Sequence, residues 1–240
     1  IKIYEKNENS IQLLSCYYRT ALIYFTIDIQ KAKDYLEKAS YHYKKSKSTN
    51  KLILAFIEMQ LGSVNSELLE YKQAIIHYKN AKKILIENYG EDSVYTSIIN
   101  LNLGLVYGKI KNFQDSEDHF QQAMTVFDKM VPEPEINKSA IYIGLGDTWL
   151  TQGIKLDSAI LLFDKTVANS KGVFGHPHPE VARGHFYKIK TYIKQKNNDL
   201  ALNSAQDALI AITKEFKNQN HEKNPLVKDF LDMDMGSSIM

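Results

Sequence analysis

Residues 74–81 read Ala-Ile-Ile-His-Tyr-Lys-Asn-Ala, so that small residues at positions 74 and 81 enclose an aromatic residue at position 78. The same spacing occurs four more times: Ala32, Leu36 and Ala39; Ser116, Phe120 and Ala123; Ala159, Phe163 and Thr166; Ala201, Ala205 and Ala208. Successive phrases begin 42, 42, 43 and 42 residues apart. A period of this length indicates a solenoid of helix pairs, each of which buries its apolar face against its neighbours. The predicted fold class is therefore all-α.

Each period has room for two amphipathic helices joined by a short polar turn. In the third unit, apolar residues follow helical spacing on both sides of Lys111-Asn112. A turn this short joins antiparallel neighbours. The sequence thus predicts about five helical hairpins within residues 1–216, followed by a polar connector and a short capping or linker segment over residues 217–240. The predicted units lie near residues 10–48, 52–90, 94–131, 136–172 and 179–216.

Glycines mark the first helix of the central units. Gly62, Gly104 and Gly146 are each 42 residues apart. Glycine inside a helix costs roughly 1 kcal/mol relative to alanine, so its regular use indicates a packing requirement. We expect each glycine to face the small-residue phrase of its own second helix, where helix backbones approach closely.

These features together resemble the tetratricopeptide repeat family. The resemblance covers residues 10–213 and rests on Leu61-Gly62, Leu103-Gly104 and Leu145-Gly146, on Tyr107 or Trp149 after them, and on the second-helix phrase. The period is longer than the common 34-residue repeat and is similar to that of kinesin light chains and many bacterial regulators. The family implies a right-handed superhelix.

Composition excludes several classes of function. The chain has 240 residues with 30 basic and 28 acidic side chains, and this balance disfavours nucleic-acid binding. No apolar run approaches the roughly 18 residues that a membrane span needs. The single cysteine, Cys16, excludes an internal disulfide and fits a reducing compartment, so a cytoplasmic location is favoured. Because the chain begins at Ile1, we expect it to be a fragment or a processed form, with any targeting segment out of sight.

Enzyme signatures are missing from the sequence, which contains no phosphate-binding glycine loop and no His-Glu-x-x-His or Gly-x-Ser-x-Gly motif. We therefore expect no catalytic activity and no cofactor. His176-Pro-His178-Pro-Glu180 invites a metal site, but it occupies the place of an inter-hairpin linker. There His178 or a neighbour would cap the next helix, with Pro179 and Glu180 in its first turn. The phrase His-Pro-x-Val-Ala is also similar to linkers of kinesin-light-chain-type repeats.

The family resemblance implies that a partner protein or peptide binds the concave face, which first helices line. Carried over position by position, that face contains Tyr17, Tyr18, Tyr24, Gln60, Ser63, Asn102, Lys109, Asp147, Thr151, Arg183, Tyr187, Lys190 and Lys194. Its last part is basic, because Arg183, Lys188, Lys190, Lys194 and Lys196 are interleaved with aromatic residues. Such a pattern suits an acidic peptide or a phosphate, and the alternative, which the sequence favours, is a solvated helix face.

Three hypotheses for the function follow. The first is a non-catalytic scaffold that binds a protein or peptide. Residues 181–226 are similar to the junction between the repeats and the caspase-like CHAT protease domain of some bacterial proteins. If this likeness holds, the scaffold would be the regulatory arm of a larger effector. The second is a sensor of signalling peptides or small ligands whose superhelix changes pitch on binding. The third is an array that only self-associates into homo-oligomers.

Overall fold

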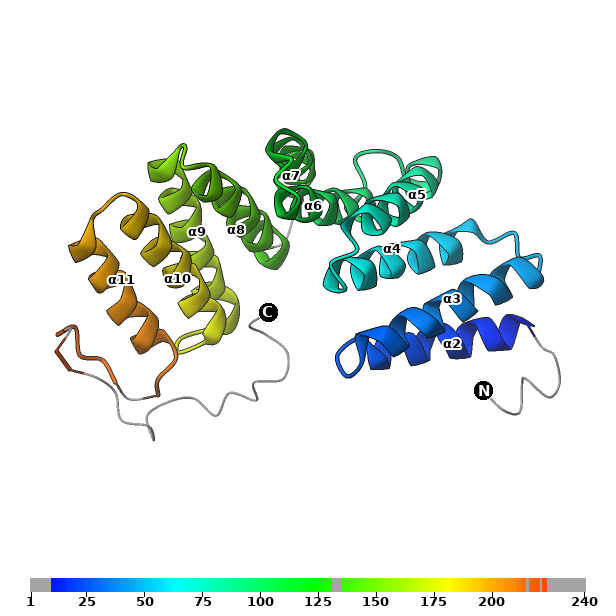
Figure 1. Ribbon diagram of the computed structural model, residues 1–240, viewed down its shortest axis with the longest axis horizontal. Coiled ribbons are helices and arrows are strands. Elements are labelled where there is room, and N and C mark those ends of the chain that lie inside the picture. The colour runs from blue at the N-terminus through cyan, green and yellow to red at the C-terminus, as the bar shows by residue number, and fades with distance from the viewer. Residues whose placement is uncertain (1–9, 131–134, 215, 221, 224–240) are drawn as a thin grey trace. The chain divides into compact units, whose positions relative to one another are not determined.

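The computed structural model describes residues 10–130, 135–214, 216–220, 222 and 223, and within them it contains ten α-helices and no β-strand (Figure 1). The helices are α2 (Ser10–Tyr24), α3 (Ile29–Lys45), α4 (Lys51–Glu67), α5 (Tyr71–Tyr89), α6 (Val94–Lys109), α7 (Phe113–Phe127), α8 (Glu135–Gln152), α9 (Leu156–Phe174), α10 (Pro179–Lys194) and α11 (Asn198–Ala211). Their order and lengths match alternating first and second helices of a repeat.

The chain divides into two compact units, residues 1–112 and residues 113–240. In unit 1, α2 packs on α3, α4 on α5, and α3 and α5 each contact the first helix that follows. In unit 2, α7 packs on α8, α8 on α9, α9 on α10, and α10 on α11. The boundary between the units falls inside the third predicted hairpin, between α6 and α7.

The periodic phrase forms the core of both units. The small residues of the first four phrases are buried, and Ala74, Ala81 and Ala159 have no exposed surface, whereas Ala208 of the fifth phrase is half-buried. A Cβ atom added to Gly62 would lie 2.6 Å from the ring of Tyr78, and one added to Gly146 would lie 2.5 Å from the ring of Phe163. The expectation that these glycines permit close packing on the second helix is confirmed, and the group they make room for is the aromatic ring at the centre of the phrase.

The first helices α4, α6, α8 and α10 end in a shared left-handed cap. The backbone φ is 61° at Leu69, 61° at Lys111, 76° at Gly153 and 60° at Lys196. After each of these residues, the next amide donates to a carbonyl five residues earlier, at Asn65, Tyr107, Trp149 and Tyr192, over 2.8 to 3.0 Å. This is the Schellman arrangement, which satisfies carbonyls that the helix end leaves open. It turns the chain sharply into the second helix.

The linker before α10 has the structure expected from its sequence. His178 Nδ1 accepts a hydrogen bond from the backbone amide of Glu180 over 3.2 Å, and Pro179 begins the helix. The imidazole also stacks on the ring of Phe174 with centroids 4.3 Å apart. The capping role predicted for His178 is confirmed.

Polar links join neighbouring hairpins at equivalent places. Lys33 of α3 pairs with Glu70, which precedes α5. Lys155, which precedes α9, pairs with Glu117 of α7 over 2.9 Å. Gln195 Nε2, before α11, donates to Asp157 Oδ1 of α9 over 2.7 Å. Each link thus joins the start of one second helix to the turn that leads into the next.

The described part of the polar connector lies along α11. The buried Gln206 side chain donates to the carbonyl oxygens of Asn218, over 2.5 Å, and Lys223, over 3.4 Å. The predicted capping segment, residues 226–235, lies outside the described residues.

Candidate partner-binding surface

Polar contacts join the first helices α8 and α10 in unit 2. Lys190 Nζ lies 3.7 Å from Asp147 Oδ1, and Lys194 Nζ donates to the backbone oxygen of Thr151 over 3.4 Å. The structure therefore brings together residues that the sequence predicted from two different repeats. We call the surface formed by Asp147, Thr151, Arg183, Phe186, Tyr187, Lys190 and Lys194 the α8–α10 surface.

Two aromatic rings form the apolar part of the α8–α10 surface. Phe186 is 55% exposed, whereas Tyr187 is half-buried and stacks on Phe163 of α9 with centroids 5.2 Å apart. Lys190 Nζ lies 5.1 Å from the centre of the Tyr187 ring and 5.7 Å from that of Phe186. Burial, reinforced by the charge of Asp147, raises the pKa of the Tyr187 phenol, so this group stays neutral at physiological pH. The surface thus offers an exposed ring beside exposed cations.

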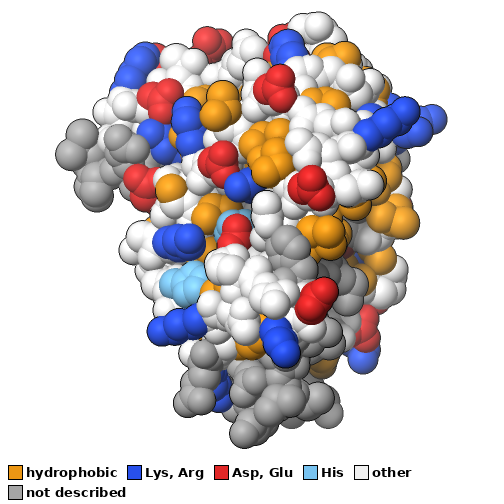
Figure 2. Space-filling view, turned by 90° about the vertical axis from the view of Figure 1, so that its left-hand side faces the viewer, with side chains coloured by type: hydrophobic (Ala, Val, Ile, Leu, Met, Phe, Trp, Pro, Cys, Tyr) orange, Lys and Arg blue, Asp and Glu red, His pale blue; other side chains and the backbone are white. Residues whose placement is uncertain are grey.

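The ion pairs of the α8–α10 surface are exposed enough to exchange partners. The side chains of Lys190 and Asp147 are 46% and 36% exposed, and those of Arg183 and Glu180, paired over 3.2 Å, are 44% and 26% exposed. Exposed pairs contribute about 0 to 1 kcal/mol, so an incoming carboxylate competes with them readily. On the face drawn in Figure 2, acidic and basic side chains are interspersed among hydrophobic ones.

Lys188 does not belong to this surface. Its ammonium group lies 2.7 Å from Asp164 of α9, and its side chain is only 15% exposed. It therefore faces the preceding second helix, whereas Lys196 lies in the left-handed turn after α10. The basic run at residues 183–196 is divided among three environments.

In unit 1 the predicted tyrosines belong to the packing of α2 on α3. Tyr17 is only 4% exposed and is a core residue, which corrects its assignment to an accessible binding face. Tyr18 and Tyr24 pack partly against the same core, and Tyr24 stacks on Tyr35 of α3 with centroids 5.4 Å apart.

The other predicted residues of unit 1 lie on α4 and α6, which contact each other. Gln60 and Asn102 are half-buried and Lys109 is exposed. Ser63 Oγ lies 3.0 Å from the hydroxyl of Tyr78, so this side chain is engaged with α5. The burial of that contact raises the pKa of Tyr78 to about 12, although the hydrogen bond from Ser63 opposes the shift.

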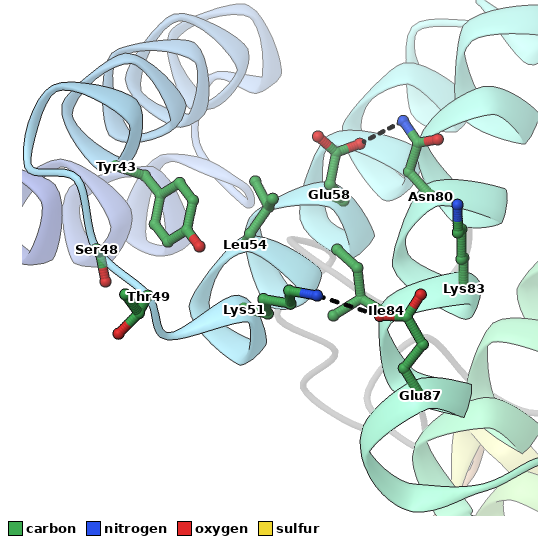
Figure 3. A pocket seen from close by; sticks show the side chains of 10 residues that line it. All are labelled: Tyr43, Ser48, Thr49, Lys51, Leu54, Glu58, Asn80, Lys83, Ile84 and Glu87. Atoms are coloured by element: carbon green, nitrogen blue, oxygen red, sulfur yellow. Dashed lines mark hydrogen bonds and ion pairs between the residues drawn. The ribbon is translucent and has the colours of Figure 1, made fainter.

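Unit 1 also has a hollow of about 580 Å³ that none of the predicted site residues lines (Figure 3). Its wall includes Ser48 and Thr49 from the turn after α3, Glu58 of α4 and Asn80 of α5. The sequence contains one signal for it, because Glu58 is the only charged residue between positions 52 and 66. An isolated carboxylate in an apolar helix is the feature from which the hollow could have been anticipated.

Across the residues that the structure describes, no three His, Cys, Asp or Glu side chains cluster as metal ligands. None of the helices in the described ranges has the length and apolar character needed to traverse a bilayer.

Comparisons with known proteins agree on the fold. Residues 54–129 match the family model of the tetratricopeptide repeat. The structure is similar to that of BtubC (BKLC) from P. vanneervenii, with a TM-score of 0.69, 17% identity, and coverage of 84% of this chain and 82% of that one. It is also similar to a candidate kinesin light chain from Podosopora anserina with nearly identical TPR-like repeats, with a TM-score of 0.64, 14% identity, and coverage of 81% and 94%. A substituted form of the latter gives a TM-score of 0.67, 14% identity, and coverage of 81% and 92%.

Residues 54–129 thus match the tetratricopeptide repeat, and the fold is similar to that of the solved kinesin-light-chain-like repeat structures. The predicted all-α fold class is confirmed. A search among curated proteins finds no match. The tetratricopeptide repeat fold is a common scaffold for protein interactions.

Proposed function

We propose that the chain is a non-catalytic scaffold that binds an acidic peptide segment of a partner protein on the α8–α10 surface. The observation that carries the proposal is the meeting of Asp147 and Lys190 across α8 and α10, beside the exposed ring of Phe186. Exposed aromatic rings supply binding energy, and nearby cations select carboxylates. The repeat fold supports this function because it commonly mediates protein interactions.

A role as the regulatory arm of a larger effector is a further part of the proposal. It rests on the likeness of residues 181–226 to the junction before a caspase-like protease domain. The sensor hypothesis has less support, because the hollow in unit 1 is open to solvent rather than enclosed. A site that senses a small ligand buries most of the surface of that ligand.

The proposal is tested by selecting short peptides displayed on phage against the chain. The α10 variant carries both Lys190→Glu and Lys194→Glu. The control is Lys165→Glu with Lys171→Glu on α9, which changes the net charge equally at two exposed positions. Synthetic copies of the enriched peptides are then measured by fluorescence polarisation. We expect the enriched peptides to be acidic and to bind the control with the same affinity as the parent chain. Their affinity for the α10 variant should be at least about tenfold lower, because charge-assisted hydrogen bonds are lost.

Peptides without acidic residues, or equal binding to both variants, would contradict the proposal. A short peptide that binds both variants equally and strongly raises the melting temperature would instead support the sensor hypothesis.

A further inference from the structure

The hollow in unit 1 lies between two second helices, with a first helix beneath it. Tyr43 comes from the end of α3, and Lys51, Leu54 and Glu58 come from α4. The opposite wall belongs to α5 and consists of Asn80, Lys83, Ile84 and Glu87 (Figure 3). A neighbouring hollow of about 380 Å³ shares Thr49, Lys51 and Glu87 with it, so the depression continues past the start of α4. A volume of this order accommodates a few side chains of a peptide.

The middle of this hollow is apolar. Leu54 and Ile84 are half-buried, and Tyr43 is 8% exposed. In Figure 3 the side chains of Leu54 and Ile84 lie between the polar groups of the two walls. An apolar side chain placed there would remove further surface of Leu54 and Ile84 from water, which favours binding.

Glu58 supplies an oriented acceptor. Its Oε2 atom lies 2.8 Å from His77 Nδ1 and accepts a hydrogen bond from Asn80 Nδ2 over 3.1 Å. Its other oxygen, Oε1, has no hydrogen-bond partner among the described residues, and the side chain is 14% exposed. A carboxylate held by two donors on one oxygen leaves the second oxygen fixed in direction.

Glu58 is ionised in this environment. Burial opposes ionisation, but the hydrogen bonds from His77 and Asn80, aided by the charges of His77 and Lys44, outweigh it and lower the pKa of the carboxyl group. A partly buried carboxylate with an unused oxygen is stabilised by a cationic donor more strongly than an exposed one, because the local dielectric constant is lower.

The remaining charges of the hollow do not satisfy Glu58. Lys51 Nζ lies 3.4 Å from Glu87 Oε2, so these two exposed side chains largely neutralise each other. Lys83 is exposed and has no ion-pair partner within the described ranges, so it remains solvated. Among the carboxylates that line the hollow, Glu58 therefore has no lysine partner in the described part of the chain, and His77 lies against only one of its two oxygens.

We propose that this hollow binds a peptide segment of a partner protein that places an arginine or lysine side chain against Glu58 and an apolar side chain on Leu54 and Ile84. The site lies wholly in unit 1, on different helices from the α8–α10 surface, and it selects the opposite charge. It is independent of the proposed function, since either site can fail without the other.

The test uses the full chain labelled with ¹⁵N and two probes, N-acetyl-leucyl-arginine amide and N-acetyl-leucyl-citrulline amide. Citrulline has the shape of arginine without its charge. At low salt we expect the arginine probe to shift the amide resonances of Glu58, Asn80 and Ile84, and the citrulline probe to bind about tenfold more weakly. Added salt should weaken the binding of the arginine probe alone.

Variants then locate the charge that recognises the probe. Glu58→Gln keeps an acceptor for His77 and Asn80 but removes the charge, and it should bind the arginine probe about as weakly as the parent chain binds the citrulline probe. Glu37→Gln, at an exposed position of α3 outside the hollow, is the matched control and should bind normally.

Equal affinity for the two probes, or shifts confined to residues outside the hollow, overturns the proposal. If Glu58→Gln does not fold, the two probes on the parent chain still decide the question.

Discussion

The contact between Gly146 and Phe163 predicts a measurable coupling between two substitutions. A methyl group at position 146 would meet Phe163 Cε1 at 2.5 Å and Cζ at 2.6 Å, and the Phe163 ring has no exposed surface into which it could move. Overpacking of this kind costs about 1 to 3 kcal/mol, whereas alanine gains about 1 kcal/mol over glycine in a helix. We therefore expect Gly146→Ala to lower the free energy of unfolding by about 1 kcal/mol.

Phe163→Leu removes the two ring atoms that the new methyl group would strike. In that background the helical preference of alanine should prevail, and Gly146→Ala should raise the free energy of unfolding by about 1 kcal/mol. The double-mutant cycle thus gives a coupling of about 2 kcal/mol. Urea denaturation followed by far-ultraviolet circular dichroism measures each corner of the cycle.

Gly172 of α9 provides the control, because a Cβ added there would meet nothing within 4 Å. Gly172→Ala should stabilise the protein by up to about 1 kcal/mol, with no coupling to Phe163→Leu. A Gly146→Ala variant as stable as Gly172→Ala, or a cycle without coupling, would show that the methyl group does not strike the Phe163 ring.

Three further predictions follow from other parts of the structure. Leu69 is 69% exposed with φ at 61°, so Leu69→Gly should relieve left-handed strain and raise the free energy of unfolding by about 1 kcal/mol in urea titrations; a loss of stability would contradict this. Burial lowers the pKa of His185 from 6.5 to about 4 although Asp207 opposes the shift, so the folded chain binds fewer protons than the unfolded chain between these values. Stability should therefore fall as the pH drops from about 6.5 to 4, and His185→Gln should show a smaller decrease when the two are unfolded by urea across that range. Lys44→Gln removes a cation near Glu58 and should therefore increase the affinity for the arginine probe, measured by the same resonance shifts. Unchanged affinity would show that Lys44 is too distant to compete with the probe.

The repeat period and the all-α fold class could be predicted because they depend on local chemistry. Small residues and glycines recur at one spacing, and the cap at His178 follows from the preferences of single helix ends. The family pattern also identified Lys190 and Lys194, since residues four apart on one helix share a face.

The orientation of individual side chains could not be read from the same pattern. Tyr17 and Tyr18 are adjacent, yet only Tyr17 is fully buried. Lys188 and Lys190 are two residues apart, and they pair with Asp164 and Asp147 on different helices. In each case, the helical phase relative to both neighbouring helices decides the outcome, and a single sequence specifies that phase only to within a residue. The hollow around Glu58 depends in addition on the path of the turn after α3.

The links between consecutive hairpins have a mechanical consequence. In unit 2, the polar link between α7 and the start of α9 joins an ammonium and a carboxylate group, Lys155 and Glu117, whereas the link between α9 and the start of α11 uses the neutral amide of Gln195. Dissolved ions screen attraction between full charges more than they weaken an amide hydrogen bond. Rising ionic strength should therefore weaken the Lys155–Glu117 link more than the Gln195–Asp157 link. The resistance of unit 2 to bending would then differ between its two hairpin junctions.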